Sequence, residues 1–175
     1  MYLRLSILSI LFLVSCKKYK DPAPFTDDRI KNKYCNDPSA INYNWDFPGV
    51  PDNTVCIYPA DIFKGNYFYR DSILNLEGGV LKTDSFPITI TQLDSTHLTI
   101  AGFCGGNTHS AKATRFFSFV LDSLVGYGQV FCNNKDTISG GGSKFSLSDT
   151  STIQFDYILQ TDTGVVIHQG TATKQ

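Results

Sequence analysis

From residue 60 to the end of the chain, apolar and polar residues alternate in short runs. These runs lie at 65–71, 86–93, 96–102, 114–121, 127–131, 152–159 and 164–173, with a shorter one between 135 and 147. A period of two puts successive side chains on opposite faces of a β-strand, and turn residues recur about every 8–12 positions. No window has a helical period. The pattern predicts an all-β domain over residues 60–175, an antiparallel meander barrel or sandwich of about eight strands.

The composition agrees with this pattern. Fifteen of the sixteen acidic residues are Asp, which favours turns and caps, and one is Glu, a helix former. The net charge of −1 argues against a nucleic-acid partner bound by charge. We therefore expect a β-rich protein that does not bind nucleic acid.

Aromatic residues on the expected strands are candidates for the inside of this domain. In the 114–121 run both faces are apolar, which predicts a strand that is covered on both sides or lines a cavity. If the domain is a barrel with a cavity, we expect the residues that line it to include Tyr67, Phe117, Phe119, Phe155 and Tyr157.

The first sixteen residues have the layout of an export signal. One positive charge in Met1–Arg4 precedes an apolar stretch that is too short to span a bilayer. The sequence Leu13-Val14-Ser15-Cys16 resembles the lipobox of bacterial lipoproteins. The resemblance implies a signal peptide over 1–15, lipidation of Cys16, a membrane anchor, and a location in the cell envelope at the outer membrane. The charged, proline-bearing segment 16–33 would then be a lipidated tether.

Four cysteines remain once Cys16 is set aside, and an oxidising compartment favours their pairing. Three pairings are possible, and proximity favours Cys35–Cys56 and Cys104–Cys132. Zinc is the alternative, but no C-x-x-C or H-x₃₋₅-H spacing is present. We expect two disulfides, no metal site and no cofactor.

Residues 34–59 are too rich in Asn, Asp and Pro for regular structure and predict a disulfide-closed loop module. The segment resembles a short repeat of secreted and surface proteins of Bacteroidetes-type bacteria. The matching residues are Cys35, Asp37, Pro38, Ala40, Asn42, Tyr43, Asn44, Cys56 and Tyr58. Its carboxylates raise the alternative of a calcium site, but the spacing D-x-[DN]-x-[DN]-G is absent. A structural loop is favoured.

The start of the β-domain carries a second resemblance. The stretch Phe63-Lys64-Gly65-Asn66-Tyr67 is similar to the G-x-W opening of lipocalin-type barrels, with Tyr in place of Trp. Small lipoproteins of the same bacterial group begin their β-domain in a similar way, with F-x-G-x-Y followed by Asp-Ser, here Asp71-Ser72. The resemblance to the lipocalin-type opening implies a lipocalin-like meander.

Asp-Ser or Asp-Thr dipeptides occur seven times, at Asp71, Asp84, Asp94, Asp122, Asp136, Asp149 and Asp162. Both side chains cap turns, so the dipeptides predict turns between strands. They also resemble the O-glycosylation sequon of Bacteroidetes. That resemblance implies modification at Ser72, Ser95, Ser123 and Thr137.

The sequence contains few residues in patterns that are typical of enzyme active sites. His97 and His168 fall at strand positions, where we expect exposed or edge histidines, and Cys104 beside His109 is expected to be disulfide-bonded. Gly140-Gly141-Gly142 is expected to break a strand or form a hairpin, since no helix follows it to make a phosphate site. The motifs of serine hydrolases, P-loop proteins and zinc proteases are absent. We expect a protein that is not an enzyme.

The sequence therefore predicts a lipid-anchored envelope lipoprotein with two possible functions. In the first, its barrel encloses a small apolar ligand. In the alternative, the domain has a filled core and acts through its surface on an envelope protein.

Overall fold

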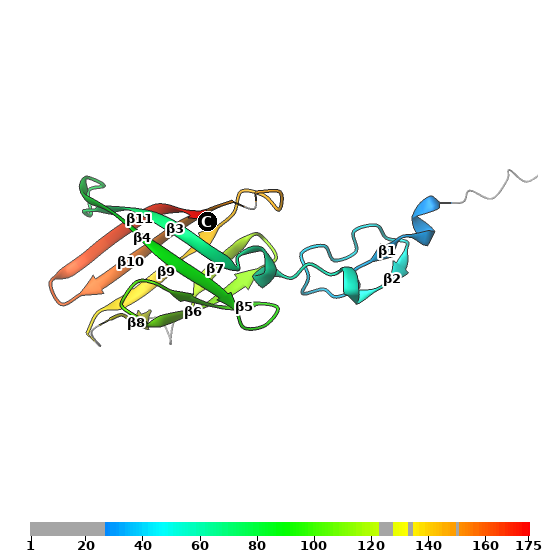
Figure 1. Cartoon of the computed structure of the whole chain (residues 1–175), viewed down its shortest axis with the longest axis horizontal. Coiled ribbons are helices and arrows are strands. Elements are labelled where there is room, and N and C mark those ends of the chain that lie inside the picture. Colours follow the sequence, from blue (N-terminus) through cyan, green and yellow to red (C-terminus); the bar gives the residue numbers. More distant parts are fainter. Residues whose placement is uncertain (1–26, 123–127, 133–134, 150) are drawn as a thin grey trace, which may run out of the picture.

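The computed structural model describes residues 27–122, 128–132, 135–149 and 151–175, which form two parts (Figure 1). A small loop module occupies residues 28–58, and a β-barrel follows it to the end of the chain. The expected signal peptide, Cys16 and Ser123 lie outside the described residues.

The module contains the 3₁₀ helices η1 (Asp28–Lys31) and η2 (Asn53–Val55) and the short strands β1 (Lys33–Tyr34) and β2 (Val50–Pro51). The 3₁₀ helix η3 (Pro59–Ile62) leads into the barrel. The strands that follow are β3 (Gly65–Leu74), β4 (Val80–Gln92), β5 (His97–Ala101), β6 (Thr108–Thr114), β7 (Ser118–Leu121), β8 (Gln129–Val130), β9 (Thr137–Ser143), β10 (Thr152–Thr161) and β11 (Gly164–Lys174).

These strands form a closed antiparallel barrel, so the all-β prediction is confirmed and the choice between barrel and sandwich is decided. The order around the wall is β10-β11-β3-β4-β5-β6-β7-β9, and β9 pairs with β10 to close the ring of eight strands. The short β8 pairs with β9 beside β7. Closure leaves the eight-stranded wall without a free end.

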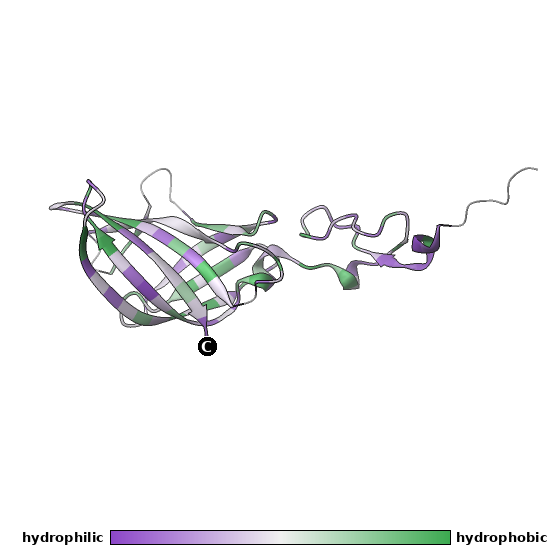
Figure 2. Cartoon of the chain, turned by 90° about the horizontal axis from the view of Figure 1, so that it is seen from above, coloured by the Kyte–Doolittle hydropathy of each residue, from purple (hydrophilic) through white to green (hydrophobic). Residues whose placement is uncertain are grey.

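The interior follows from the alternation of each strand. In β10 the side chains of Ile153, Phe155 and Tyr157 are at most 3% exposed, while those between them face outward. Figure 2 shows the same alternation of hydrophobic and hydrophilic positions along the strands of the wall. Phe155 lies at the centre of the core, with its ring centroid 5.4–5.8 Å from the rings of Tyr69, Phe103, Phe119 and Tyr157.

The prediction for Gly140-Gly141-Gly142 was wrong, because these residues lie inside β9 and neither break it nor turn it. They pair with β10 on one side and, at Gly141 and Gly142, with β7 on the other. A Cβ atom at Gly142 would lie 2.5 Å from the ring of Phe119. The glycine therefore leaves the room that this ring needs inside the barrel.

The expected single strand at 114–121 is a hairpin. β6 ends at Thr114, a turn follows, and β7 begins at Ser118. Phe117 lies in the turn with a φ of 58°, a left-handed conformation, and is not part of the core. The expectation that Phe117 lines the interior was wrong, because the turn interrupts the alternation on which it was based.

The end of the barrel next to the module is closed by η3 and the residue after it. Phe63 is fully buried and its ring lies 5.1 Å from that of Phe119. The hydroxyl of Tyr67 donates to the carbonyl oxygen of Phe63 over 2.8 Å, and the N–H of Ala60 donates to the carbonyl of Ser95. We call this the near end, and the opposite end of the barrel the far end.

Packing around Phe155 predicts where the stability of the barrel comes from. We expect Phe155→Ala to lower the free energy of unfolding by about 3–5 kcal/mol, since it removes a ring at the centre of the core. Phe116→Ala, at a side chain that is 74% exposed, should change it by less than about 0.5 kcal/mol. Urea unfolding followed by circular dichroism measures both. Equal losses would contradict the assignment of the core.

Candidate functional site

Four of the five residues expected to line a cavity lie in the barrel core. Tyr67, Phe119, Phe155 and Tyr157 are at most 3% exposed and belong to one continuous cluster of buried side chains. The ring of Phe155 lies 5.4 Å from that of Phe119 and 5.5 Å from that of Tyr157, measured between centroids, and the hydroxyl of Tyr67 donates to the carbonyl oxygen of Phe63. These side chains fill the interior with protein atoms.

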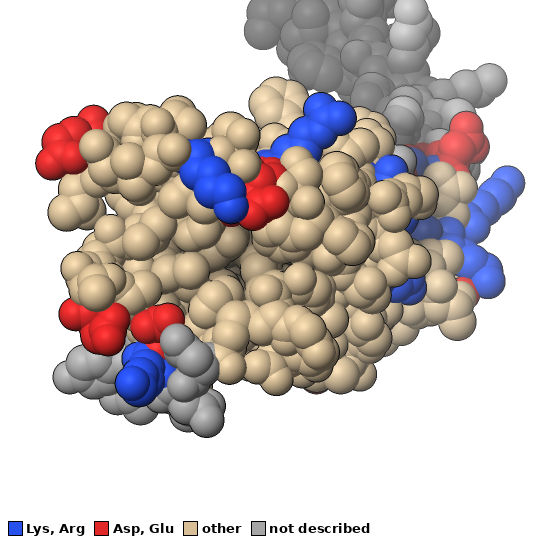
Figure 3. Space-filling model, turned by 60° about the vertical axis from the view of Figure 1, so that its left-hand side comes forward, with Lys and Arg blue, Asp and Glu red and all other residues tan. Residues whose placement is uncertain are grey.

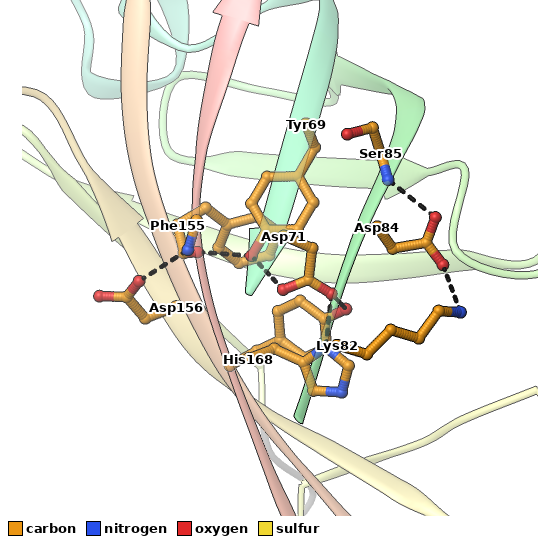
Figure 4. A network of polar contacts seen from close by, with 10 residues as sticks. Tyr69, Asp71, Lys82, Asp84, Ser85, Phe155, Asp156 and His168 are labelled. Atoms are coloured by element: carbon orange, nitrogen blue, oxygen red, sulfur yellow. Dashed lines mark hydrogen bonds and ion pairs between the residues drawn. The ribbon is translucent and has the colours of Figure 1, made fainter. Parts of the chain in front are cut away.

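A buried polar network lies in the far half of the barrel (Figure 4), on β3, β10 and β11. Asp71 Oδ2 is 2.6 Å from Nδ1 of His168 and 3.5 Å from the hydroxyl of Tyr157. The hydroxyl of Tyr69 donates to Asp71 Oδ1 over 3.3 Å and to the carbonyl of Phe155 over 2.9 Å. Asp71 is 3% exposed and His168 6%, so the pair is shielded from solvent.

This network was not predicted from the sequence. His168 was expected to be exposed or at an edge, and Asp71 was expected to cap a turn; both predictions were wrong. Asp71 lies within β3 and faces inward, where β11 brings His168 to it from 97 positions along the chain. Asp84 is also in a strand and not a turn, since it pairs with Asp71 across β3 and β4. The signal available in the sequence was period two alone, which puts Asp71 on the face of Tyr67 and Tyr69.

The Asp71–His168 pair resembles half of a catalytic triad but lacks the other half. A carboxylate on Nδ1 orients a histidine so that Nε2 can act as a base. Among the described residues, no hydroxyl or thiol is hydrogen-bonded to Nε2 of His168. The imidazole instead stacks on the ring of Tyr157, with centroids 4.3 Å apart and planes 11° apart. The hydrogen bonds of the network join β3, β10 and β11.

The tyrosines of the network stay protonated. Burial, followed by the nearby Asp71 carboxylate, raises the pKa of both Tyr69 and Tyr157 far above the usual value. A protonated hydroxyl can donate to the carboxylate, which satisfies a buried charge. The tyrosines therefore act as hydrogen-bond donors to Asp71.

The far end is covered by two phenylalanines that one disulfide holds together. Phe103 and Phe131 each precede a cysteine of the Cys104–Cys132 bond, and their ring centroids are 6.3 Å apart. The ring of Phe103 lies 5.3–6.3 Å from those of Phe86, His109, Phe131, Phe155 and Tyr157. Phe103 is therefore a plug that completes the core beneath the far-end loops.

His109 lies under this plug. Its ring stacks on Phe131 with centroids 5.6 Å apart and planes 17° apart, and the residue is 2% exposed. Its Nε2 has no hydrogen-bond partner among the described residues. Burial lowers the pKa of His109, because a protonated ring would lose its hydration there.

Three cavities border the outer wall of the barrel and its loops. One of about 400 Å³ is lined by residues of β9, β10 and β11 and by the loop between β9 and β10, which includes Lys144 and Phe145. Others of about 260 Å³ and 220 Å³ border Thr137 and Ile62. Tyr67, Phe119, Phe155 and Tyr157 line none of these three cavities. No three His, Cys, Asp or Glu side chains among the described residues are grouped to hold a metal ion.

The other predicted positions lie outside the barrel core. Both expected disulfides, Cys35–Cys56 and Cys104–Cys132, are present. Ser72 lies in β3, Ser95 in the β4–β5 turn and Thr137 at the start of β9, each partly exposed; their glycosylation stays a prediction. The turn expected at Asp94 is confirmed, since Asp94 accepts the N–H groups of Thr96 and His97.

No known family of proteins matches the sequence, and no curated protein does. Solved structures to which the chain is similar include a redesigned β-barrel, 15% identical with a TM-score of 0.42, which covers 67% of this chain and 95% of that one. Another is a protein of unknown function of the DUF3598 family from Nostoc punctiforme. It is 11% identical with a TM-score of 0.43, over 66% of this chain and 49% of that one.

Removal of the Asp71 carboxylate tests how much the network contributes to the stability of the barrel. We expect Asp71→Ala to lower the free energy of unfolding by about 2–4 kcal/mol, because His168 and two tyrosines lose their buried partner. Asp84→Ala is the matched control, since Asp84 is the register partner of Asp71 but has a side chain 49% exposed and paired with Lys82. It should cost less than about 1 kcal/mol. A cost for Asp84→Ala as large as that for Asp71→Ala in urea unfolding would refute this role.

The burial of His109 should make the free energy of unfolding depend on pH. Burial lowers the pKa of His109 in the folded barrel from its usual value of 6.5. As the pH falls below 6.5, the imidazole therefore takes up a proton in the unfolded chain before it does so in the folded barrel. The free energy of unfolding should therefore decrease as the pH drops below 6.5, by at most about 1.4 kcal/mol per pH unit for this one proton. His109→Gln should flatten the slope measured by urea unfolding at a series of pH values. Identical slopes in the two proteins would contradict the prediction.

Proposed function

We propose that this protein is a lipid-anchored lipoprotein of the bacterial cell envelope, and that its barrel is a non-enzymatic module with a filled core that acts through its surface. The partner would be another component of the envelope at the outer membrane. Of the two functions that the sequence left open, this is the one that the packing supports.

The observation that carries the proposal is the position of Phe103. Its ring occupies the far half of the barrel and contacts five other rings, and the disulfide beside it fixes the loop that bears it. At the near end η3 and Phe63 close the barrel. An apolar ligand pocket is typically 300 Å³ or more, and a ligand of that size would have to displace these rings.

The outer surface supports an interaction that is not driven by strong charge. On the face shown in Figure 3, side chains of both signs are interspersed around a broad neutral area. The protein as a whole has a net charge of −1. Long-range attraction to a highly charged partner is weak for such a surface.

The anchor is supported by the sequence before the described residues. An apolar run, a small residue and Cys16 form the lipobox-like stretch, and the remaining four cysteines are paired in disulfides, as in exported proteins. Within the described residues no helix is long and apolar enough to cross a bilayer. Two or three acyl chains on Cys16 would hold such a chain at the membrane.

Native mass spectrometry tests both halves of the proposal on protein made in a bacterium that processes lipoproteins. We expect a chain that begins at Cys16, carries the mass of its acyl groups and contains two disulfides, with no small molecule retained in the barrel. Cys16→Ser should remove the acyl mass. A different first residue would refute the anchor, and a retained apolar molecule would instead support the ligand-binding function.

A further inference from the structure

The loop module exposes an unusual share of large apolar side chains. Ile30, Trp45, Phe47 and Val50 are 54%, 50%, 57% and 50% exposed. The only tryptophan of the chain is among them. Four exposed large apolar side chains in so small a unit mark an interaction surface. We call these four residues the apolar face of the module.

The chain trace brings these residues into neighbouring positions. The N–H of Val50 donates to the carbonyl oxygen of Asn32 over 2.7 Å, which lays β2 against the segment after η1. The ring of Phe47 packs edge-on against that of Tyr34, 5.7 Å away. The segment that carries Trp45, Phe47 and Val50 therefore runs beside the segment of Ile30 and Tyr34.

The module holds this face in a fixed conformation. The Cys35–Cys56 disulfide closes the loop, and the side chain of Asn42 both donates to the carbonyl of Val55 and accepts the N–H of Ile57, each over 2.8 Å. Asn44 and Asp46, on either side of Trp45, have φ values of 57° and 64°, which Asn and Asp tolerate better than other residues. The apolar side chains are thus carried by a structured loop that a disulfide and hydrogen bonds hold in place.

The position of the module along the chain indicates what its apolar face contacts. η1, β1 and β2 lie at the end of the molecule away from the barrel (Figure 1). Only eleven residue steps separate Cys16 from Asp27, where the described structure begins. At about 3.5 Å per residue this chain can reach at most about 40 Å. A bilayer that holds acyl groups on Cys16 is therefore within reach of the apolar face at all times.

We propose that the apolar face docks onto the lipid surface of the membrane to which the chain is tethered, with Trp45 and Phe47 at the level of the headgroups. This inference rests on the lipid anchor of the proposed function. Trp is enriched at that depth because its ring is amphipathic. Tethering makes the contact intramolecular, so an affinity that is weak in solution suffices.

The charges of the module indicate that docking is apolar and not electrostatic. Two of its three cationic residues, Arg29 and Lys33, are paired with Asp27 and Asp52, at 2.6 Å and 2.7 Å. Residues 27–58 carry five Asp and three Lys or Arg, a formal charge of 3 − 5 = −2. Docking should therefore occur on zwitterionic as well as anionic lipid and persist at high salt.

Because Trp45 is the only tryptophan, its fluorescence reports docking directly. The acylated full chain is reconstituted into phosphatidylethanolamine–phosphatidylglycerol vesicles, with and without lipids brominated near the headgroup end of the acyl chains. We expect a blue shift of the emission, quenching by the brominated lipid, and loss of quenching by aqueous acrylamide. In Phe47→Ser/Val50→Ser we expect the docked fraction to fall by about tenfold or more.

Leu76→Ser/Val80→Ser is the matched control. These side chains are 69% and 64% exposed on the β3–β4 hairpin at the far end, so their replacement should leave the quenching unchanged. Disulfide mapping of Cys35–Cys56 shows whether the module of the test variant has folded. If it has not, Val50→Ser alone serves, and a fall in quenching relative to the control is again expected.

The outcomes separate this inference from the proposed function. An acylated chain whose Trp45 is quenched by acrylamide and not by brominated lipid overturns the docking face and leaves the anchor. Protection from acrylamide without lipid quenching would mean that a protein surface or a second copy covers Trp45, which also overturns it. Lipid quenching in a chain without an acyl mass would support the face and refute the anchor.

Discussion

Closure of the sheet at β9 is the constraint on which the rest of the structure depends. β9 pairs with β10 and with β7, and its glycines allow the rings of neighbouring strands to enter the interior at that point. Gly170 does the same in β11, where a Cβ atom would lie 2.7 Å from the ring of Tyr69. A barrel this narrow can be closed around so many aromatic residues only if some inward positions carry no side chain.

A closed and filled barrel changes what its polar residues can do. Asp71, His168 and the two tyrosines around them would form a binding site if the interior were open to solvent. With Phe103 above and Phe155 beside them, they instead satisfy one another and join β3, β10 and β11. The physical chemistry of the interior is therefore that of a core.

The two parts of the molecule divide their roles by position. The barrel buries one continuous core of side chains, whereas the module has a small core around Cys35 and Ala40 and leaves Trp45 and Phe47 half exposed. A unit of that size needs a disulfide to hold its shape. The part of the chain next to the expected anchor is thus the part with the smaller core.

The sequence by itself determined the class of fold and the disulfide pairs, because period two and the spacing of cysteines are local properties of the chain. It could not separate a barrel from a sandwich, since that depends on the pairing of β9 with β10. The shorter run expected between 135 and 147 is β9. The break expected at Gly140–Gly142 and the single strand expected through Phe117 were wrong, because the room for neighbouring rings and the backbone conformation overrode local propensity. Asp71 and His168, 97 positions apart, and the plug formed by Phe103 were decided by tertiary structure alone, because such contacts depend on strand register and closure.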